Sequence, residues 1–335
     1  MKILSPLACV LTLAVWPMPG FACEGKLHIE IEHTGVYAIN HAAIVAQQPG
    51  LANCKSEMLQ MASAGVQVPI RVIDGGDGRF DAGDSIEWVG EQLQGSESWF
   101  NPFSINNVYL LGASIGKHAR IRDALPENAQ AAGASLQRAL HYEQENLMIR
   151  LDQSQQEPGA EPDVWQWAKI THADPAPFQF TFDLPDLDNR DGSVSLKLNF
   201  RGLSRAPNSI GHDTIEDHAT DVVINGSRIE QLVWSGRDEV THEVRVSAKS
   251  LKARGNALTI TVPKRSIPWD ERNPLVDVVM FNWAEFRFGI GGDIDAGPLP
   301  LSVRDEDSKP IRLTWGAQGE LVLYGLDGVR RPALR

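Results

Sequence analysis

The sequence predicts an all-β protein with minor α content, built as two β-rich domains, the second an antiparallel β-sandwich of jelly-roll-like type. Two patterns predict this class. Apolar and polar residues alternate over short runs, as in half-buried strands. Gly and Pro separate these runs at short intervals along the chain. The length of 335 residues exceeds what one small core usually organises and therefore favours two domains.

Residues 1–22 have the layout of a secretory signal peptide. Lys2 supplies a positive charge, the stretch from Ile3 to Trp16 is largely apolar, and small residues lead up to Ala22. Pro17 interrupts the apolar run before it reaches the roughly 20 residues that a spanning helix needs. We expect cleavage after Ala22 and a mature protein in the periplasm, outside the cell or at its surface. An uncleaved anchor and lipidation of Cys23 remain as alternatives.

The cysteines agree with export. Cys9 leaves with the signal peptide, so the mature chain keeps Cys23 and Cys54. An even pair in an oxidising compartment is typical of a disulfide. A catalytic thiol needs a neighbouring base, and neither cysteine has one beside it in the sequence. We therefore predict a structural Cys23–Cys54 disulfide.

The N-terminal domain is expected at residues 23–153. Its first strand begins at Leu27, where apolar residues alternate through Ile31, and a turn at 33–35 leads to a second short strand. One or two helical turns are expected at 40–48 and a loop at 123–135. Residues 136–151 fit a helix or a strand equally well. Further strands are predicted at 65–74, 85–91 and 107–112.

A polar, proline-bearing linker at 154–164 separates this domain from the predicted sandwich at 165–290. The turn Asn225-Gly226 between two apolar runs is the strongest short-range signal for a hairpin with a type I′ turn. A C-terminal extension, 291–335, ends in a hairpin at about 310–325. Seven sandwich strands are predicted, at 178–184, 193–201, 220–224, 228–234, 241–246, 257–263 and 276–288.

Several of these strand-and-turn motifs resemble a known family. HTGVYAIN, VQVPIRVID with GDGRFDAGDSIEWVGE, NNVYLLG, DHATDVVINGSRIEQLVWSG, SLKARGNALTITVP and DVVMFNWAEFRF are similar to the non-catalytic region that precedes the peptidase domain in gingipain-type cysteine peptidases. The resemblance spans about Leu27 to Gly325. It implies a β-rich accessory region that assists folding, restrains activity or contacts partners.

No catalytic residue is carried over from that family. Its peptidase domain needs a His and a nucleophilic Cys, and no cysteine follows Cys54 in this chain. We therefore expect a non-enzymatic accessory region standing alone. The sequence does not say whether a separate peptidase is associated with it.

An acidic, glycine-rich loop is the stronger of two candidate metal sites. Its carboxylates lie close in sequence and are spaced by glycines, and such oxygens are the ligands that Ca²⁺ prefers. The spacing fits an EF-hand loop imperfectly, and a solvated hairpin loop is the alternative. Calcium is the cofactor that the sequence favours. The candidate ligands are Asp74, Asp77, Asp81, Asp84 and Glu87.

Tryptophans near predicted loops offer a second kind of site, because exposed rings can stack on sugars. Trp165, Trp167 and Trp269 are the candidates for facing a ligand such as a carbohydrate. Trp234 and Trp283 fall within predicted strands and are expected in the core.

Two further patterns are weak. Residues 112–116 fit Gly-x-Ser-x-Gly, but that elbow needs a helix directly after the serine, and the surroundings indicate β-structure. The acidic and histidine cluster at 212–221 matches no standard zinc motif. A formal net charge of −12 does not favour binding to nucleic acid or anionic lipid.

The leading functional hypothesis is thus an exported, non-catalytic interaction or assembly module whose partner is another envelope or secreted protein. The second hypothesis is a sandwich that binds carbohydrate or calcium. A hydrolase whose triad is hidden from sequence is the third, because such triads are defined by geometry.

Overall fold

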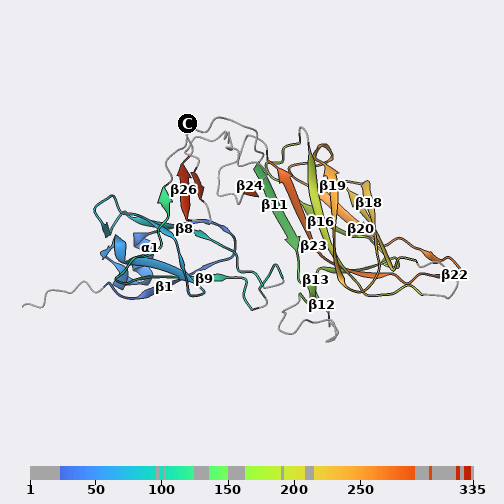
Figure 1. Ribbon diagram of the computed structural model, residues 1–335, viewed down its shortest axis with the longest axis horizontal. Helices are drawn as coiled ribbons and strands as arrows, with labels where there is room; N and C mark the ends of the chain where they lie inside the picture. The colour runs from blue at the N-terminus through green and yellow to red at the C-terminus, as the bar shows by residue number, and fades with distance from the viewer. Residues whose placement is uncertain are drawn as a thin grey trace, which may run out of the picture.

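The computed structural model describes residues 23–95, 98–101, 103–123, 136–149, 163–189, 192–207, 215–290, 302–303, 322–324 and 328–332. The predicted signal peptide and most of the predicted linker lie outside the described residues. Strands dominate, and all but one of the strand pairings among the described residues are antiparallel, which confirms the predicted all-β class. Figure 1 shows two lobes side by side, which we call the N-terminal lobe and the sandwich. Among the described residues, no helix is long and apolar enough to cross a membrane.

Two antiparallel sheets form the N-terminal lobe. Alternation places Ile86 and Trp88 of one strand in the core, while Glu87 between them points away from it. One sheet has the order β1 (Lys26–Ile31), β9 (Asn107–Ala113), β4 (Leu59–Ser63) and β5 (Val66–Val68). The other has the order β2 (Gly35–Asn40), β8 (Ser85–Gly90) and β6 (Ile70–Ile73), and the short pair β3 (Cys54–Lys55) and β7 (Arg79–Phe80) lies beside them.

The expected helical turns are present as α1 (His41–Gln47). Asn40 caps its N-terminus, because its side-chain oxygen accepts a hydrogen bond of 2.8 Å from the Ala43 amide. Ile44 anchors the helix in the lobe core. Two 3-10 turns follow, η1 (Pro49–Leu51) and η2 (Ser56–Met58).

The predicted disulfide is also present. Cys23 and Cys54 are joined with Cα atoms 5.3 Å apart, across 31 residues of sequence. Cys54 is buried in the lobe core, and Cys23 packs against that core. The bond therefore ties the start of the described chain to β3, and it is typical of proteins that fold in an oxidising compartment.

The sandwich consists of two facing sheets around one aromatic-rich core. All seven predicted strands occur, within a few residues of their expected ends. The larger sheet has the order β19 (Glu239–Ser247), β16 (Ser193–Gly202), β23 (Val278–Gly289), β11 (Leu136–Glu143) and β24 (Ser302–Val303), with β14 (Ala168–Thr171) also paired to β23. The smaller has the order β15 (Phe178–Phe182), β20 (Asn256–Thr261), β17 (His218–Ile224) and β18 (Ser227–Trp234).

The turn between β17 and β18 has the predicted geometry. Asn225 and Gly226 both adopt positive φ angles, 50° and 81°, as a type I′ turn requires. The remaining short elements of the sandwich are the pair β12 (Leu147–Met148) and β13 (Trp165–Gln166), the pair β21 (Ser266–Ile267) and β22 (Asp270–Pro274), and the 3-10 turn η4 (Ala248–Ser250).

Strand β11 corrects the predicted domain boundary. It pairs along its length with β23, so residues 136–143 belong to the sandwich and not to the N-terminal domain that we predicted to reach residue 153. Leu140 and Tyr142 explain why, since both pack against the sandwich core. The open choice between helix and strand for this segment is thereby settled as strand.

The C-terminal extension returns to both lobes. Its short strand β24 pairs with the start of β11, whereas β25 (Val322–Tyr324) and β26 (Val329–Pro332) form a hairpin beside the N-terminal lobe (Figure 1). There β26 pairs in parallel with β10 (Arg122–Asp123), and the Tyr324 hydroxyl donates a 2.6 Å hydrogen bond to Glu87. Most of the hairpin predicted at about 310–325 lies outside the described residues, and the strands of the described hairpin lie at 322–324 and 329–332.

Candidate binding site

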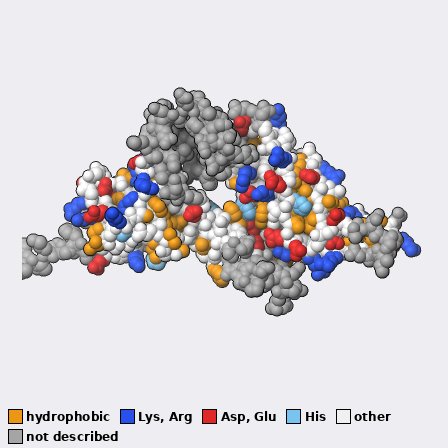
Figure 2. All heavy atoms as spheres, in the orientation of Figure 1, with side chains coloured by type: hydrophobic (Ala, Val, Ile, Leu, Met, Phe, Trp, Pro, Cys, Tyr) orange, Lys and Arg blue, Asp and Glu red, His pale blue; other side chains and the backbone are white. Residues whose placement is uncertain are grey.

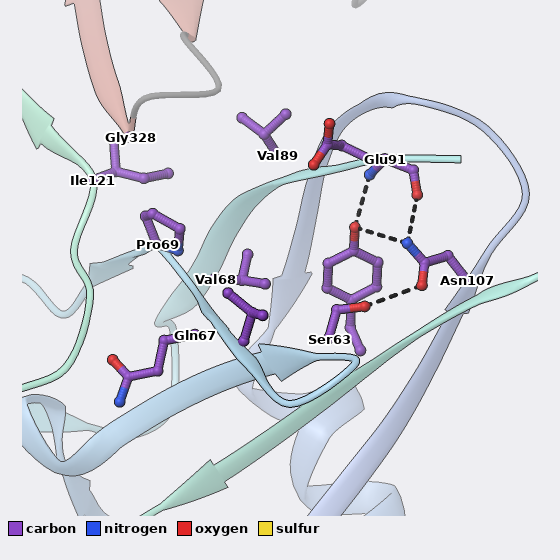
Figure 3. Close-up of a pocket in the computed structure, with 11 residues that line it drawn as sticks. Ser63, Gln67, Val68, Pro69, Val89, Glu91, Asn107, Ile121 and Gly328 are labelled. Carbon is purple, nitrogen blue, oxygen red and sulfur yellow. Dashed lines mark hydrogen bonds between the residues drawn. The ribbon is translucent and has the colours of Figure 1, made fainter. Parts of the chain in front are cut away.

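A cavity of about 310 Å³ opens in the N-terminal lobe. It lies beside the tip of the β4–β5 hairpin, between the ends of β8 and β9 and the residue that precedes β26 (Figure 3). Positive φ angles at Ala64 and Gly65, 47° and 81°, make the tight two-residue turn that brings β5 back over this opening.

One wall of the cavity is apolar. Val66, Val68 and Val89 line it together with Pro69 and Ile121. Val66 stands out because 69% of its surface is exposed, although it sits on a short, well-paired strand. An exposed aliphatic side chain at the mouth of an apolar cavity is available to a partner.

The opposite wall is a closed hydrogen-bond network (Figure 3). The Glu91 amide donates to the Tyr109 hydroxyl over 2.7 Å, and the Asn107 side-chain amide donates to the Glu91 carbonyl over 2.8 Å. The Ser63 hydroxyl donates to the Asn107 side-chain oxygen over 3.0 Å. Burial raises the pKa of Tyr109 above its usual value, so the phenol stays neutral. These polar groups hold the wall rigid.

The side chains of Ser63, Asn107 and Tyr109, which line the cavity, are hydrogen-bonded to neighbouring groups. Both hydroxyl groups at the cavity are engaged, that of Ser63 by Asn107 and the Val108 carbonyl and that of Tyr109 by the Glu91 amide. The described lining residues include no His, Cys or Lys. A volume of about 310 Å³ is at the lower end of small-molecule sites, which span roughly 300–1,000 Å³. It is suited to one or two side chains of a partner polypeptide.

A second cavity, of about 550 Å³, lies at the edge of the sandwich beside β11 and β15. His141 and Glu143 of β11 are among its lining residues, but their side chains are only 8% and 0% exposed, with Nε2 and Oε2 2.6 Å apart. The Trp99 ring, from the loop after β8, stacks on His141 with centroids 4.1 Å apart and planes 11° from parallel. This contact joins the N-terminal lobe to the sandwich.

Burial keeps both members of this pair neutral. Desolvation raises the pKa of Glu143 to about 8, and the charges of Asp163 and Glu239 add to the rise. Desolvation also lowers the pKa of His141 to about 4, although Glu285 opposes that shift. At neutral pH the protonated Glu143 carboxyl therefore donates a hydrogen bond to the His141 Nε2 atom.

These shifts predict how the free energy of unfolding changes with pH in protein from which metal ions have been removed with a chelator. The raised pKa of Glu143 contributes stability that is lost as pH rises from 4.5 to about 8. The lowered pKa of His141 contributes stability that is lost as pH falls from 6.5 to about 4. Between pH 4.5 and 6.5 the two effects on the free energy of unfolding are opposite and cancel, so we expect it to be constant there. Between pH 6.5 and 8 only the Glu143 effect remains, and the free energy of unfolding should fall by at most about 2 kcal/mol.

Urea unfolding at a series of pH values measures this profile. Glu143→Gln should abolish the fall in unfolding free energy between pH 6.5 and 8, because the amide does not titrate. Glu285→Gln on the neighbouring strand should still show that fall. An alkaline slope that is the same in Glu143→Gln and the unchanged protein would show that burial of Glu143 is not its cause.

The structure does not gather the five predicted calcium ligands. Asp74 accepts from the Gly76 amide, Asp77 from the Arg79 amide and Asp84 from the Asp81 amide, so these carboxylates close their own turns. In the described parts of the chain, no three His, Cys, Asp or Glu side chains are placed to hold a metal ion. Calcium at this loop stays a prediction, with the geometry favouring the solvated-loop alternative.

Glu87 in particular belongs to a different environment. It lies on β8, where Arg71 pairs with it at 3.1 Å and Tyr324 of the C-terminal hairpin donates to it. Its inclusion in the acidic loop followed from sequence proximity and is not supported by its position in the fold.

The three candidate ligand-facing tryptophans do not form one surface. Trp167 is only 8% exposed and packs against Phe178, Phe180 and Phe281 in the sandwich core, so our expectation that it is exposed is wrong. Trp165 on β13 and Trp269 beside β22 are half-buried and lie at separate places in the sandwich (Figure 1). Of the two tryptophans expected in the core, Trp234 is buried. Trp283 is half-buried and lies beside the His141 ring, so the expectation is wrong for Trp283.

The two weak motifs also have local roles. The Ser114 hydroxyl lies 3.5 Å from the His118 Nε2 atom, but that nitrogen also lies 2.9 Å from the Ser114 carbonyl, an acceptor that competes for it. In the 212–221 cluster, His218 is fully buried, and its Nδ1 and Nε2 atoms contact Asp277 and the Gly236 carbonyl. Both of its nitrogens are occupied, so neither is free for a metal.

Sequence reasoning missed His141 and Glu143. Their signal was the alternation in the 136–143 segment, where Leu140 and Tyr142 pack on the sandwich core and the two titratable residues take the intervening positions. That signal is informative only once the segment is assigned as a strand. Trp99 was missed because the sequence around it contains no strand or turn pattern that places it.

The fold defined here is a pair of antiparallel sheets in the N-terminal lobe followed by a β-sandwich. No family model and no curated protein matches the sequence. Among solved structures, dimeric latent PorU from Porphyromonas gingivalis is similar over 87% of this chain and 26% of its own, with a TM-score of 0.55 and 12% identity. The chain thus spans about a quarter of the length of PorU, and the likeness is one of fold alone.

Other similarities are weaker. PNGase F from Flavobacterium meningosepticum aligns over 84% of this chain and 93% of its own, at 8% identity and a TM-score of 0.27. A score this low carries no argument about function.

Proposed function

We propose that this chain is an exported, non-catalytic accessory module that binds another envelope or secreted protein. The observation that carries the proposal is the apolar cavity beside the β4–β5 hairpin with Val66 exposed at its mouth. Protein interfaces concentrate their binding energy in a few side chains that fill such pockets. The resemblance to the accessory region of gingipain-type peptidases and the fold shared with part of PorU support the same class of role.

The distribution of charge agrees with recognition of a protein. Acidic and basic side chains are interspersed over the face of the molecule in Figure 2, with apolar side chains between them. Such a mixed surface does not attract one class of polyelectrolyte, which needs a continuous field of one sign. Specificity would then come from the shape of the cavity and from the polar groups at its rim.

Catalysis is the less favoured alternative. The strongest titratable pair outside that cavity is His141 with Glu143, whose side chains are 8% and 0% exposed, and the Trp99 ring covers His141. A general acid or base must come within hydrogen-bond reach of its substrate. Two buried side chains under a stacked ring do not meet this requirement.

Affinity capture from a cell-envelope extract of the source organism tests the proposal. The unchanged protein should retain one stoichiometric partner, and Val66→Asp should weaken its binding at least tenfold, because a charge at the cavity mouth must be desolvated on contact. The matched control is Ile115→Asp. Ile115 is 93% exposed in the same lobe but does not line the cavity.

The control variant should bind the partner as the unchanged protein does. Retention of the partner by Val66→Asp, or its loss in both variants alike, would rule out this cavity as the binding surface. Turnover of a substrate by the purified protein on a broad hydrolase panel would overturn the non-catalytic assignment.

A further inference from the structure

The outer face of the larger sandwich sheet carries a group of buried polar side chains. Asn199 of β16 and Asn282 of β23 are each 1% exposed, and Gln166 of β13 and the Glu143 side chain are fully buried. Four oxygen atoms in this group have no hydrogen-bond partner, and we call them the oxygen cluster. They are Glu143 Oε1, Gln166 Oε1, Asn199 Oδ1 and Asn282 Oδ1.

A β-bulge brings these side chains to the same face. The pairing of β16 with β23 shifts register so that Asn199 alone opposes both Asn282 and Trp283. The flanking residues Phe281 and Ala284 belong to the sandwich core, so the two bulge residues face outward together. Glu143 is paired directly with Trp283 and therefore points to the same side.

Gln166 joins the group from the adjoining segment. The Trp167 amide donates to the Phe281 carbonyl over 2.9 Å, which places Gln166 next to Asn282. Because Trp167 lies in the core, alternation turns Gln166 to the outer face. Three strands and the β13 segment thus contribute one oxygen each.

The amide groups are oriented with their oxygens free. The Asn199 nitrogen donates to Glu239 and Thr241 on β19, so its oxygen is turned away from β19 and toward β23. The Asn282 nitrogen donates to Asp163 over 2.8 Å, and the Gln166 nitrogen donates to the Trp165 carbonyl. Glu239, Asp163 and the Trp165 carbonyl can only accept, so a flipped amide would place its oxygen against another acceptor at each position, although the Thr241 hydroxyl beside Asn199 can also donate.

The surroundings are short of positive charge. Glu143 and Asp163 are both buried, and the nearby Arg201 is already paired with Glu239 at 3.3 Å. Buried acceptors without donors are costly, and the buried Glu143 carboxyl, which keeps its proton when no ion is bound, can ionise only beside a counter-charge. One bound cation would supply a partner for the four oxygens and a counter-charge for the carboxylates.

We propose that the oxygen cluster, with Asp163 beside it, binds a divalent cation of the Ca²⁺ class. Carboxylate and amide oxygens in an irregular, flexible set are the ligands that Ca²⁺ accepts and that softer metals do not prefer. This site differs from the acidic loop at 74–87, because amides supply most of its ligands. It is also independent of the interaction proposed for the cavity beside Val66.

The position of the cluster gives the cation a structural role. Glu143 contacts His141, and His141 stacks on Trp99 of the N-terminal lobe. A cation that fixes the Glu143 carboxylate would hold the His141 ring in place against Trp99. Binding should therefore stabilise the contact between the two lobes.

Calorimetric titration of the chelator-treated protein with CaCl₂, and Tb³⁺ luminescence sensitised by nearby tryptophans, test this site. One ion should bind per chain. Glu143→Gln should lower the affinity at least tenfold while preserving side-chain size, and Gln166→Met should lower it several-fold by removing one oxygen. Circular dichroism of each variant checks that the sheet structure is retained.

Two controls identify the site. Glu285→Gln, which removes a half-buried acid on the same sheet, should leave the affinity unchanged, as should the double variant Asp81→Asn with Asp84→Asn in the acidic loop. Absence of Ca²⁺ binding at millimolar concentration would overturn the proposal and leave water as the occupant. Binding that survives Glu143→Gln, or that is lost in the loop variant, would place the ion elsewhere.

Discussion

Replacing Asp277 by Ala is expected to lower the free energy of unfolding by about 3–5 kcal/mol, the cost of removing one partner from a buried ionic cluster. Asp277 is 1% exposed. One of its oxygens lies 2.8 Å from the His218 Nδ1 atom, and the other accepts from Arg265 and from the Ala219 amide over 2.8 and 2.9 Å. Truncation removes this acceptor from His218, Arg265 and the Ala219 amide.

Removing Asp277 should also weaken the hydrogen bonds that its partners make to other groups. Arg265 also donates to the Glu216 and Asp217 carbonyls, so it links the chain before β17 to the chain before β23. His218 additionally contacts the Gly236 carbonyl at 3.0 Å. Without Asp277, the entry to β17 loses its connection to the larger sheet.

Urea unfolding monitored by tryptophan fluorescence measures this effect. Asp221→Ala is the matched control, because Asp221 also lies on β17 and accepts from two side chains, Arg228 and Gln231. Its pair with Arg228 is solvent-accessible, so the control should cost less than about 1 kcal/mol. Equal losses in the two variants would contradict a special role for the buried cluster.

The same cluster shows what the sequence around His218 does not contain. The 212–221 pattern is a weak metal motif and gives no hint of the partner that fixes His218, because Asp277 lies 59 residues away. Pairing over that distance depends on how the strands are ordered. A local pattern does not contain this information.

The strands themselves were predictable because their signals are local. Alternation in the 85–90 segment places Ile86 and Trp88 in the core, and the positive φ angles of Asn225 and Gly226 follow from residue types that tolerate them. Side-chain alternation and turn chemistry require no knowledge of the partner strand. They account for all seven predicted sandwich strands.

The domain boundary was not predictable in this way. Residues 136–143 carry a pattern compatible with either helix or strand, and only pairing with β23 assigns them to the sandwich. Trp167 was misjudged for a related reason. It precedes a short strand near a predicted loop, but the backbone bond from its amide to Phe281 draws it into the core.

The predicted calcium loop and the proposed oxygen cluster differ in how far apart their residues lie along the sequence. Asp74, Asp77 and Asp84 are neighbours in sequence, and each satisfies a nearby amide. Glu143, Asn199 and Asn282 are far apart in sequence and are brought to one face by adjacent strands and a bulge. A site assembled across strands cannot be found from spacing along the chain.

Removing the Cys23–Cys54 disulfide is expected to cost about 3–4 kcal/mol of unfolding free energy. A closed loop of 31 residues restricts the unfolded chain, and the entropy of that restriction gives a value in this range. Because Cys54 is buried, the double variant Cys23→Ala with Cys54→Ala avoids placing a hydroxyl in the core.

Thermal unfolding with and without reductant separates the crosslink from packing. Reductant should lower the melting temperature of the unchanged protein and leave that of the double variant unaffected. The difference between the reduced unchanged protein and the double variant then reports only the lost packing of the two sulfur atoms, which should be the smaller contribution. A melting temperature that does not respond to reductant in the unchanged protein would show that the bond is absent or does not limit stability. The stability of the N-terminal lobe would then depend on packing in the core that contains Leu51, Phe80 and Cys54.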